Sequence, residues 1–159
     1  MVNAETITVK KIWDILETVC DPEVPVLTIL DLGIVRDVIV NEGIEIVVTP
    51  TYTGCPAMDM ISMNIRMAML QHGYNDVKIT QVLSPAWTTA WMTEAGKEKL
   101  KAYGIAAPNP RFDIPRDGIE CPQCNSKNTK LLSEFGSTAC KSLFQCVDCR
   151  EPFDYFKCH

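Results

Sequence analysis

Two Cys-x-x-Cys pairs near the C-terminal end constrain the fold of this chain more than any other feature. The pairs comprise Cys121, Cys124, Cys146 and Cys149, and 21 residues separate the first pair from the second. Four thiolates at this spacing can hold one tetrahedral metal ion, most often zinc. The intervening segments 130–133 and 142–145 are expected to form the two strands of a ribbon. Because so short a module has little core of its own, we expect the ion to supply much of its stability.

Two other assignments of these four cysteines stay open at this point. An iron ion of the rubredoxin type would use the same four ligands, and disulfide bonds could join the same sulfurs. Residues 1–11 lack the apolar core of a secretion signal and no segment reaches transmembrane length, so we expect a cytoplasmic protein. In that compartment the eight cysteines are more often metal ligands or reactive thiols than disulfides.

The charge of the chain limits its partners. The formal net charge is -5 and the sequence pI is about 5.0, whereas a general binder of nucleic acid or of an anionic membrane needs a basic surface. Residues 119–159 hold five Lys or Arg against five Asp or Glu, so the ribbon is not expected to bind nucleic acid either.

Ahead of the cysteine pairs, hydrophobic periodicity predicts a compact α+β domain with the element order α-β-β-α-β-α. The expected helices and strands cover residues 9–20, 34–40, 44–49, 55–72, 77–82 and 88–103. We therefore expect a domain over 1–104, a semi-extended linker over 105–118, which holds three of the ten prolines, and the zinc ribbon over 119–159.

Cys55 stands at the turn between a predicted strand and a predicted helix. Pro56 suits the first helical position, where no amide donor is needed. Unpaired backbone N–H groups and the positive end of the helix dipole would favour the thiolate form of Cys55. The alternative is that Cys55 is a small buried residue that fills the turn.

Four other chemically active residues fall outside the paired cysteines. Cys20 lies on the apolar face of the first predicted helix and is expected to be structural. Cys140 lies at the predicted hairpin of the ribbon, where neighbouring Lys141 favours thiolate, although a plain hairpin tip is an equal alternative. Cys158 and His159 could bind a second metal, but chain ends often fray.

Several motifs resemble those of two related families. Those shared with the small α+β domain of the SufT family, which serves iron–sulfur cluster assembly, are Asp21-Pro22-Glu23-Val24-Pro25-Val26, Asp31-Leu32-Gly33, Thr51 and Gly54-Cys55-Pro56. The segments 84–93, 134–141 and 151–158 are more specific. With them, essentially the whole chain resembles the PaaD-like (PaaJ-like) proteins, which accompany the bacterial phenylacetyl-CoA epoxidase.

The resemblance implies a non-catalytic role in aerobic phenylacetate catabolism. PaaD-like proteins are thought to help assemble or repair the iron–sulfur cluster of the reductase component, so the implied partners are the epoxidase components and the iron–sulfur assembly machinery. The implied cluster or sulfur site comprises Asp21, Glu23, Thr51 and Cys55, with Cys140 as a further candidate. Cys55 would be a thiolate ligand or sulfur carrier, and Thr51 would donate a hydroxyl hydrogen bond to its sulfur. The implied cofactors are structural zinc and a transiently held iron–sulfur cluster or iron.

No paired Glu-x-x-His helices of a di-iron oxygenase occur in the sequence, and neither does a glycine fingerprint for flavin or nicotinamide. Oxygen activation by this chain alone is therefore not expected. The main alternative to a maturation factor is a scaffolding subunit of the oxygenase complex without sulfur chemistry. A third interpretation is a zinc-ribbon regulator of transcription.

Overall fold

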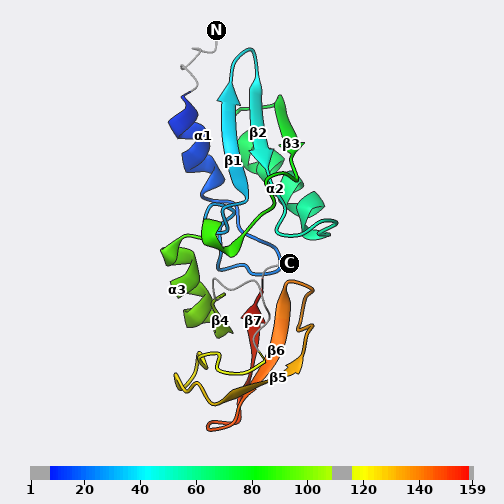
Figure 1. The fold of residues 1–159 in the computed structure, drawn as a ribbon. Helices are drawn as coiled ribbons and strands as arrows, with labels where there is room; N and C mark the ends of the chain where they lie inside the picture. The colour runs from blue at the N-terminus through cyan, green and yellow to red at the C-terminus, as the bar shows by residue number, and fades with distance from the viewer. Residues whose placement is uncertain (1–7, 109–115, 158–159) are drawn as a thin grey trace. The chain divides into compact units, whose positions relative to one another are not determined.

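The computed structural model describes residues 8–108 and 116–157 (Figure 1). It forms two compact units, Met1–Trp87 and Thr88–His159. Each unit has its own sheet and its own buried side chains, so each is described by itself. The protein is α+β, as the sequence predicted.

A three-stranded sheet forms one layer of the first unit. Its strands are β1 (Val35–Val40), β2 (Ile44–Val48) and β3 (Val77–Gln81), in the order β1-β2-β3. β1 and β2 are antiparallel and joined by a tight turn, whereas β3 runs parallel to β2 and is reached through helix α2 (Ala57–Gln71). These strands and α2 confirm the predicted elements within one or two residues.

Helix α1 (Val9–Leu16) begins where Thr8 accepts a hydrogen bond from the Lys11 amide. It ends four residues before the predicted end at residue 20. Beyond it, the Thr18 hydroxyl donates to the Ile15 carbonyl at 2.7 Å, and Cys20 forms a β-bridge with Thr28. The prediction that Cys20 is on the apolar face of a helix is therefore wrong, and its side chain is exposed.

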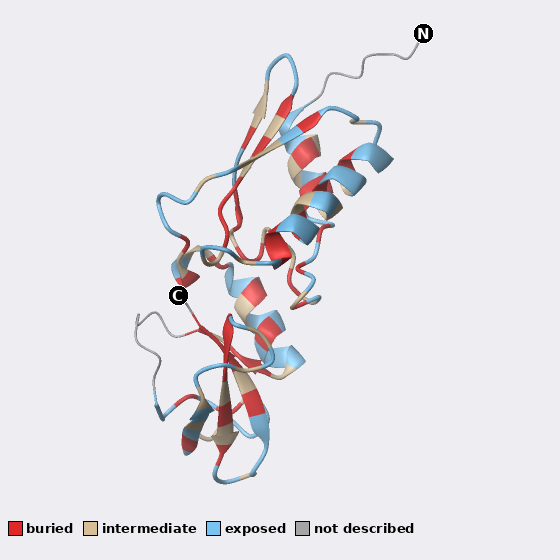
Figure 2. Cartoon of the chain, turned by 90° about the vertical axis from the view of Figure 1, so that its right-hand side faces the viewer, coloured by how far each residue is buried: buried red, intermediate tan, exposed pale blue. Residues whose placement is uncertain are grey.

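The core of the first unit lies between the helices and the sheet. α2 turns one buried stripe towards it and leaves the opposite stripe exposed (Figure 2). The Trp87 indole closes this core and donates to the Leu32 carbonyl at 2.7 Å. The fully buried side chains include Ile12, Leu16, Leu27, Ile29, Ile46, Ile61, Ile65 and Met69.

The second unit holds a four-stranded sheet in the order β4-β7-β6-β5. The strands are β4 (Ile105–Ala106), β5 (Thr129–Ser133), β6 (Lys141–Cys146) and β7 (Pro152–Phe156). β5 and β6 are the two predicted ribbon strands. β7 was not predicted, and it pairs with β6 and, in parallel, with β4.

The last predicted helix is interrupted. A short 3-10 turn, η1 (Thr89–Trp91), is followed by extended Met92, and helix α3 (Glu94–Tyr103) then begins with the Thr93 hydroxyl accepting from the Gly96 amide at 2.9 Å. The Thr93 cap therefore begins a new helix after the extended residue Met92. Trp87 and Trp91 therefore do not stand one turn apart on a helix.

The boundary between the two compact units falls between Trp87 and Thr88 in the sequence, so residues 88–104 belong to the second unit. Strand β4 lies inside the segment 105–118 that was expected to be a linker. The limits of independently folding domains, predicted as 1–104 and 119–159, stay a prediction.

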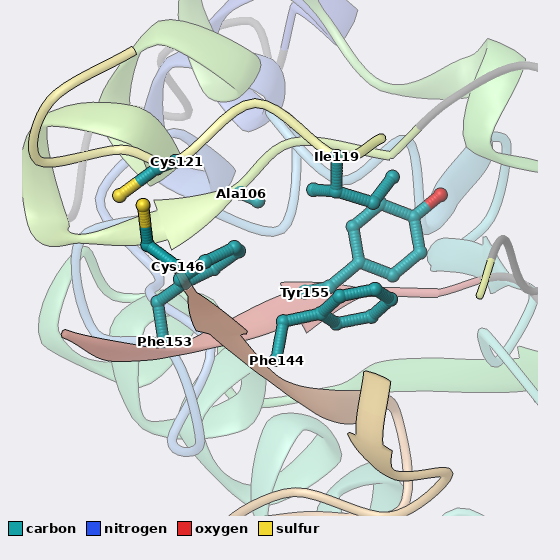
Figure 3. Close-up of a cluster of buried hydrophobic side chains, with 7 residues drawn as sticks. All are labelled: Ala106, Ile119, Cys121, Phe144, Cys146, Phe153 and Tyr155. Atoms are coloured by element: carbon teal, nitrogen blue, oxygen red, sulfur yellow. The ribbon is translucent and has the colours of Figure 1, made fainter. Parts of the chain in front are cut away.

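Aromatic side chains build the core of the second unit beneath two of the paired cysteines (Figure 3). The Phe144 ring stacks on Phe153 with centroids 5.9 Å apart and meets Tyr155 edge-on at 5.6 Å. The buried cluster comprises Ala106, Ile119, Cys121, Phe144, Cys146, Phe153 and Tyr155.

Candidate metal centre and reactive cysteine

The four paired cysteines converge as predicted. Their sulfur atoms all lie within 4.8 Å of one another, with Cys121 Sγ 3.7 Å from Cys149 Sγ and Cys124 Sγ 3.6 Å from Cys146 Sγ. A tetrahedral zinc ion with Zn–S bonds of about 2.3 Å requires sulfurs about 3.8 Å apart. The arrangement therefore fits a structural Zn²⁺ ion with four thiolate ligands and no open position. Within the described part of the chain, no other group of three potential ligands comes this close.

The two Cys-x-x-Cys turns repeat the same backbone design. The residue after each second cysteine is left-handed, with φ 61° at Asn125 and 65° at Arg150. The next amide, of Ser126 or Glu151, donates to the sulfur of the second cysteine. The carbonyl of that same residue accepts from the amide of the first cysteine, at 2.8 Å for Cys121 and 3.0 Å for Cys146. A backbone amide thus donates to the sulfur of the second cysteine in each pair.

Side chains around the turns tie them together. The Asp148 carboxylate in the second turn accepts from the Ser126 hydroxyl and, at 2.8 Å, from the side-chain Nδ2 of Asn128. The Cys149 and Asp148 amides donate to Cys146 and lower the pKa of its thiol to about 7, although burial opposes this shift. Amide donors that stabilise a charged sulfur favour zinc binding, because the ion binds thiolate.

Cys55 is half-buried and lies two residues before Ala57, the first residue of α2. The backbone N–H of Ala57 and the side chain of Tyr52 hydrogen-bond to its sulfur. Burial nevertheless raises the pKa of the Cys55 thiol above its ordinary value, and the carboxylates of Glu23 and Asp21 add to the rise. The Ala57 amide favours the thiolate, as expected for the start of a helix, but desolvation of the sulfur outweighs this donor.

The predicted site residues around Cys55 fall into different roles. Asp21 is 8% exposed, and its Oδ1 accepts from the amides of Glu23 and Val24, both at 2.8 Å. Asp21 is thus a turn residue as well as a nearby charge. Glu23 and Thr51 are partly buried, and the role of Thr51 as a donor to the sulfur stays a prediction.

Cys140 belongs to the second unit and is 5% exposed. Its sulfur lies 3.0 Å from the Thr138 hydroxyl, and its carbonyl accepts from the Lys157 amide at 3.0 Å. Burial lowers the pKa of Lys157, while the charges of Glu134 and Cys140 raise it. The Lys157 ammonium bonds to the Glu134 carbonyl and stands 4.2 Å from the centre of the Phe135 ring. Cys158 and His159 lie outside the described residues.

Sequence reasoning missed Tyr52. It lies three residues before Cys55, within the motif that drew attention to the cysteine, but a tyrosine in a loop has no spacing signature. The positive φ values of Asn125 and Arg150 were also missed, although Asn after a Cys-x-x-Cys pair is a recognisable signal for a left-handed residue.

Comparisons with known proteins agree with both the α+β unit and the four-cysteine ribbon. Residues 10–80 match the model of the iron–sulfur cluster assembly protein family, and residues 107–157 match that of the PaaD zinc beta ribbon domain. A domain of unknown function from Bacillus anthracis has 29% identity and a TM-score of 0.54, over 57% of this chain and 89% of its own. A conserved hypothetical protein from Thermotoga maritima has 27% identity and a TM-score of 0.51, over 59% and 94%. Fold and site thus define an iron–sulfur assembly domain joined to a zinc ribbon.

Two curated relatives narrow this class. A protein of Escherichia coli K12, provisionally named as a component of 1,2-phenylacetyl-CoA epoxidase, is 51% identical over 94% of this chain and 93% of its own length. The chain belongs to the PaaD family. An Fe-S protein maturation auxiliary factor of Porphyromonas gingivalis is 38% identical over 58% of this chain and 90% of its own. None of the helices among residues 8–108 and 116–157 has the length and apolarity to cross a membrane.

Proposed function

We propose that this protein is a non-catalytic accessory factor of a phenylacetyl-CoA epoxidase system, and that it helps assemble or mature the iron–sulfur cluster of the reductase component. The name of the Escherichia coli relative and the iron–sulfur assembly match at residues 10–80 support this role. Its partners would be the reductase, the other epoxidase components and the iron–sulfur assembly machinery. The reaction it serves is ring 1,2-epoxidation in aerobic phenylacetate catabolism.

One observation carries this proposal. Cys55 is half-buried, lies outside the four-sulfur group found among the described residues, and stands where the charges of Asp21 and Glu23 act on it. A single accessible sulfur beside carboxylates can hold iron or a cluster weakly enough to release it, whereas the closed Cys121–Cys149 site cannot exchange cargo without losing a ligand. Binding iron would displace the proton of the Cys55 thiol to water. Cys140 is a second candidate sulfur, with less access because it is buried.

Anaerobic reconstitution with iron and sulfide tests the cargo site. We expect wild-type protein to turn brown, and Cys55→Ala to lose that colour while its zinc content is unchanged. Cys20→Ala is the matched control, since Cys20 is an exposed thiol of the same unit. A brown Cys55→Ala protein with wild-type iron and sulfide content would contradict the proposal.

A scaffolding role without sulfur chemistry is the second candidate, and an exposed stripe on α2 favours it. Met60, Met63, Met67 and Leu70 are each about half exposed, at 49%, 56%, 53% and 58%. Their spacing of three, four and three residues places them on one helix face. Such a face could dock on an epoxidase component. Stable co-purification with the epoxidase, unaffected by Cys55→Ala, would favour this candidate.

A further inference from the structure

Side chains join the two Cys-x-x-Cys turns of the second unit to each other. Ser126 and Asn128 follow the first turn, and Asp148 lies inside the second, between Cys146 and Cys149. One oxygen of the Asp148 carboxylate accepts from the Ser126 hydroxyl, and the other accepts from Asn128 Nδ2 at 2.8 Å. Two donors on one carboxylate fix its orientation as well as its position.

Ser126 also connects the backbones of the two turns. Its hydroxyl accepts from the Asn128 amide at 3.0 Å, and its carbonyl accepts from the Cys121 amide at 2.8 Å. The Asn128 carbonyl in turn accepts from the Val147 amide of the second turn at 2.8 Å. Each turn is therefore held to the other through groups that are not metal ligands.

We infer that Ser126, Asn128 and Asp148 form a clasp that positions the two sulfur pairs and slows the loss of zinc. Each turn contributes one sulfur to each of the two contacts between the pairs, at 3.7 and 3.6 Å. The turns must separate, or a sulfur must swing away, before the site can lose an ion, and the clasp opposes that separation. This role is independent of the sulfur chemistry proposed for Cys55.

The charge of Asp148 alone would act in the opposite direction. A carboxylate close to four thiolates repels them, so a purely electrostatic role predicts that removing Asp148 strengthens zinc binding. The clasp predicts weaker binding, because the carboxylate is the acceptor that the two donors of the first turn share. The sign of the change therefore separates the two explanations.

Zinc release from the full-length, zinc-loaded protein into an excess of a chromophoric chelator tests the clasp. Replacing groups that orient metal ligands typically costs about 10- to 100-fold in metal affinity. We expect Asp148→Ala to release zinc about tenfold faster and to bind it about tenfold more weakly, the lower end of that range, because these hydrogen bonds are exposed.

Two further variants show whether the clasp acts as one unit. Ser126→Ala should accelerate release to a similar extent without changing the charge. Combining it with Asp148→Ala should stay within about twofold of Asp148→Ala alone, because both substitutions break the same contact. Asp117→Ala is the matched control, since it removes an exposed carboxylate of the same unit outside both turns, and it should release zinc at the wild-type rate.

A release rate for Asp148→Ala that is within about twofold of wild type, or slower, would overturn the clasp. Equal acceleration in Asp117→Ala would do so too, and so would effects of Ser126→Ala and Asp148→Ala that multiply. Hydrogen exchange of the zinc-loaded variants should show wild-type protection of β6 and β7, whereas lost protection there would indicate general unfolding and contradict a positioning role. The assay follows zinc alone, so failure of iron loading at Cys55 is seen separately in Cys55→Ala.

Discussion

Gly136 packs so closely against the carboxylate of Asp154 that a Cβ atom at this position would collide with Oδ1. The same carboxylate accepts from the Ser137 amide at 3.4 Å and from the Ser137 hydroxyl at 2.8 Å. β7 thus holds the loop that leads to Cys140. We expect Gly136→Ala to destabilise the folded protein by about 1–3 kcal/mol, as overpacking does.

Thermal or urea unfolding measures this effect, and Gly43→Ala is the control. Gly43 has open space within 4 Å of its Cβ position and should cost far less. Equal stabilities for Gly136→Ala and wild type would show that Asp154 does not hold the loop tightly.

Metal removal should unfold the second unit alone. The zinc thiolates and the aromatic cluster beneath Cys121 and Cys146 form one small core, so losing the ion leaves buried sulfurs without the metal that they coordinate. We expect purified protein to be colourless with one zinc per chain, and a strong chelator to remove the β-ribbon signal while amides of β2 and α2 stay protected from hydrogen exchange. A red protein with one iron and no zinc would instead identify a rubredoxin-type site.

Asp21 should contribute to stability through its oxygen atom. Replacing it by alanine leaves the amides of Glu23 and Val24 without their acceptor, at a cost of about 1–3 kcal/mol. Asp21→Asn keeps a side-chain oxygen and should stay closer to wild type in chemical denaturation. If alanine and asparagine cost the same, the charge of Asp21 and not its acceptor oxygen is what matters for folding.

The charge of Asp21 should act on Cys55 in the opposite direction to the phenol of Tyr52. Because the carboxylate raises the pKa of the Cys55 thiol, Asp21→Asn should lower that pKa and speed alkylation at pH 7 by about two- to threefold. The difference should vanish at a pH where the thiol is fully ionised in both proteins. Asp14→Asn, which removes a surface carboxylate paired with Lys10, should leave the rate unchanged, and an unchanged rate in Asp21→Asn would argue against the electrostatic coupling.

Residue spacing and hydrophobic periodicity predicted those features that depend on residues close together in the sequence. The spacing of the two Cys-x-x-Cys pairs predicted that their four sulfurs would converge on one site, while it left zinc, iron and disulfide bonds as alternatives. Strands β1, β2 and β3 and helix α2 follow from hydrophobic periodicity. The place of Cys55 at the start of α2 follows from the same pattern.

Features that depend on tertiary contacts were missed. Val19 and Cys20 continue the apolar spacing of α1, yet the helix ends at Leu16 and Cys20 pairs with Thr28 in a β-bridge. Strand β7 has no alternating pattern, since both Tyr155 and Phe156 are buried. The pKa of Cys55 could not be predicted either, because it depends on how deeply the fold buries the sulfur.

The iron and sulfide content of the reductase component measures the central claim most directly. The reductase would be produced together with this protein, purified without oxygen and analysed beside the same preparation made with Cys55→Ala. We expect a nearly full cluster with wild-type protein and with the Cys20→Ala control, and a several-fold lower iron and sulfide content with Cys55→Ala. A reductase loaded to the same level by Cys55→Ala would contradict a role of this cysteine in its maturation.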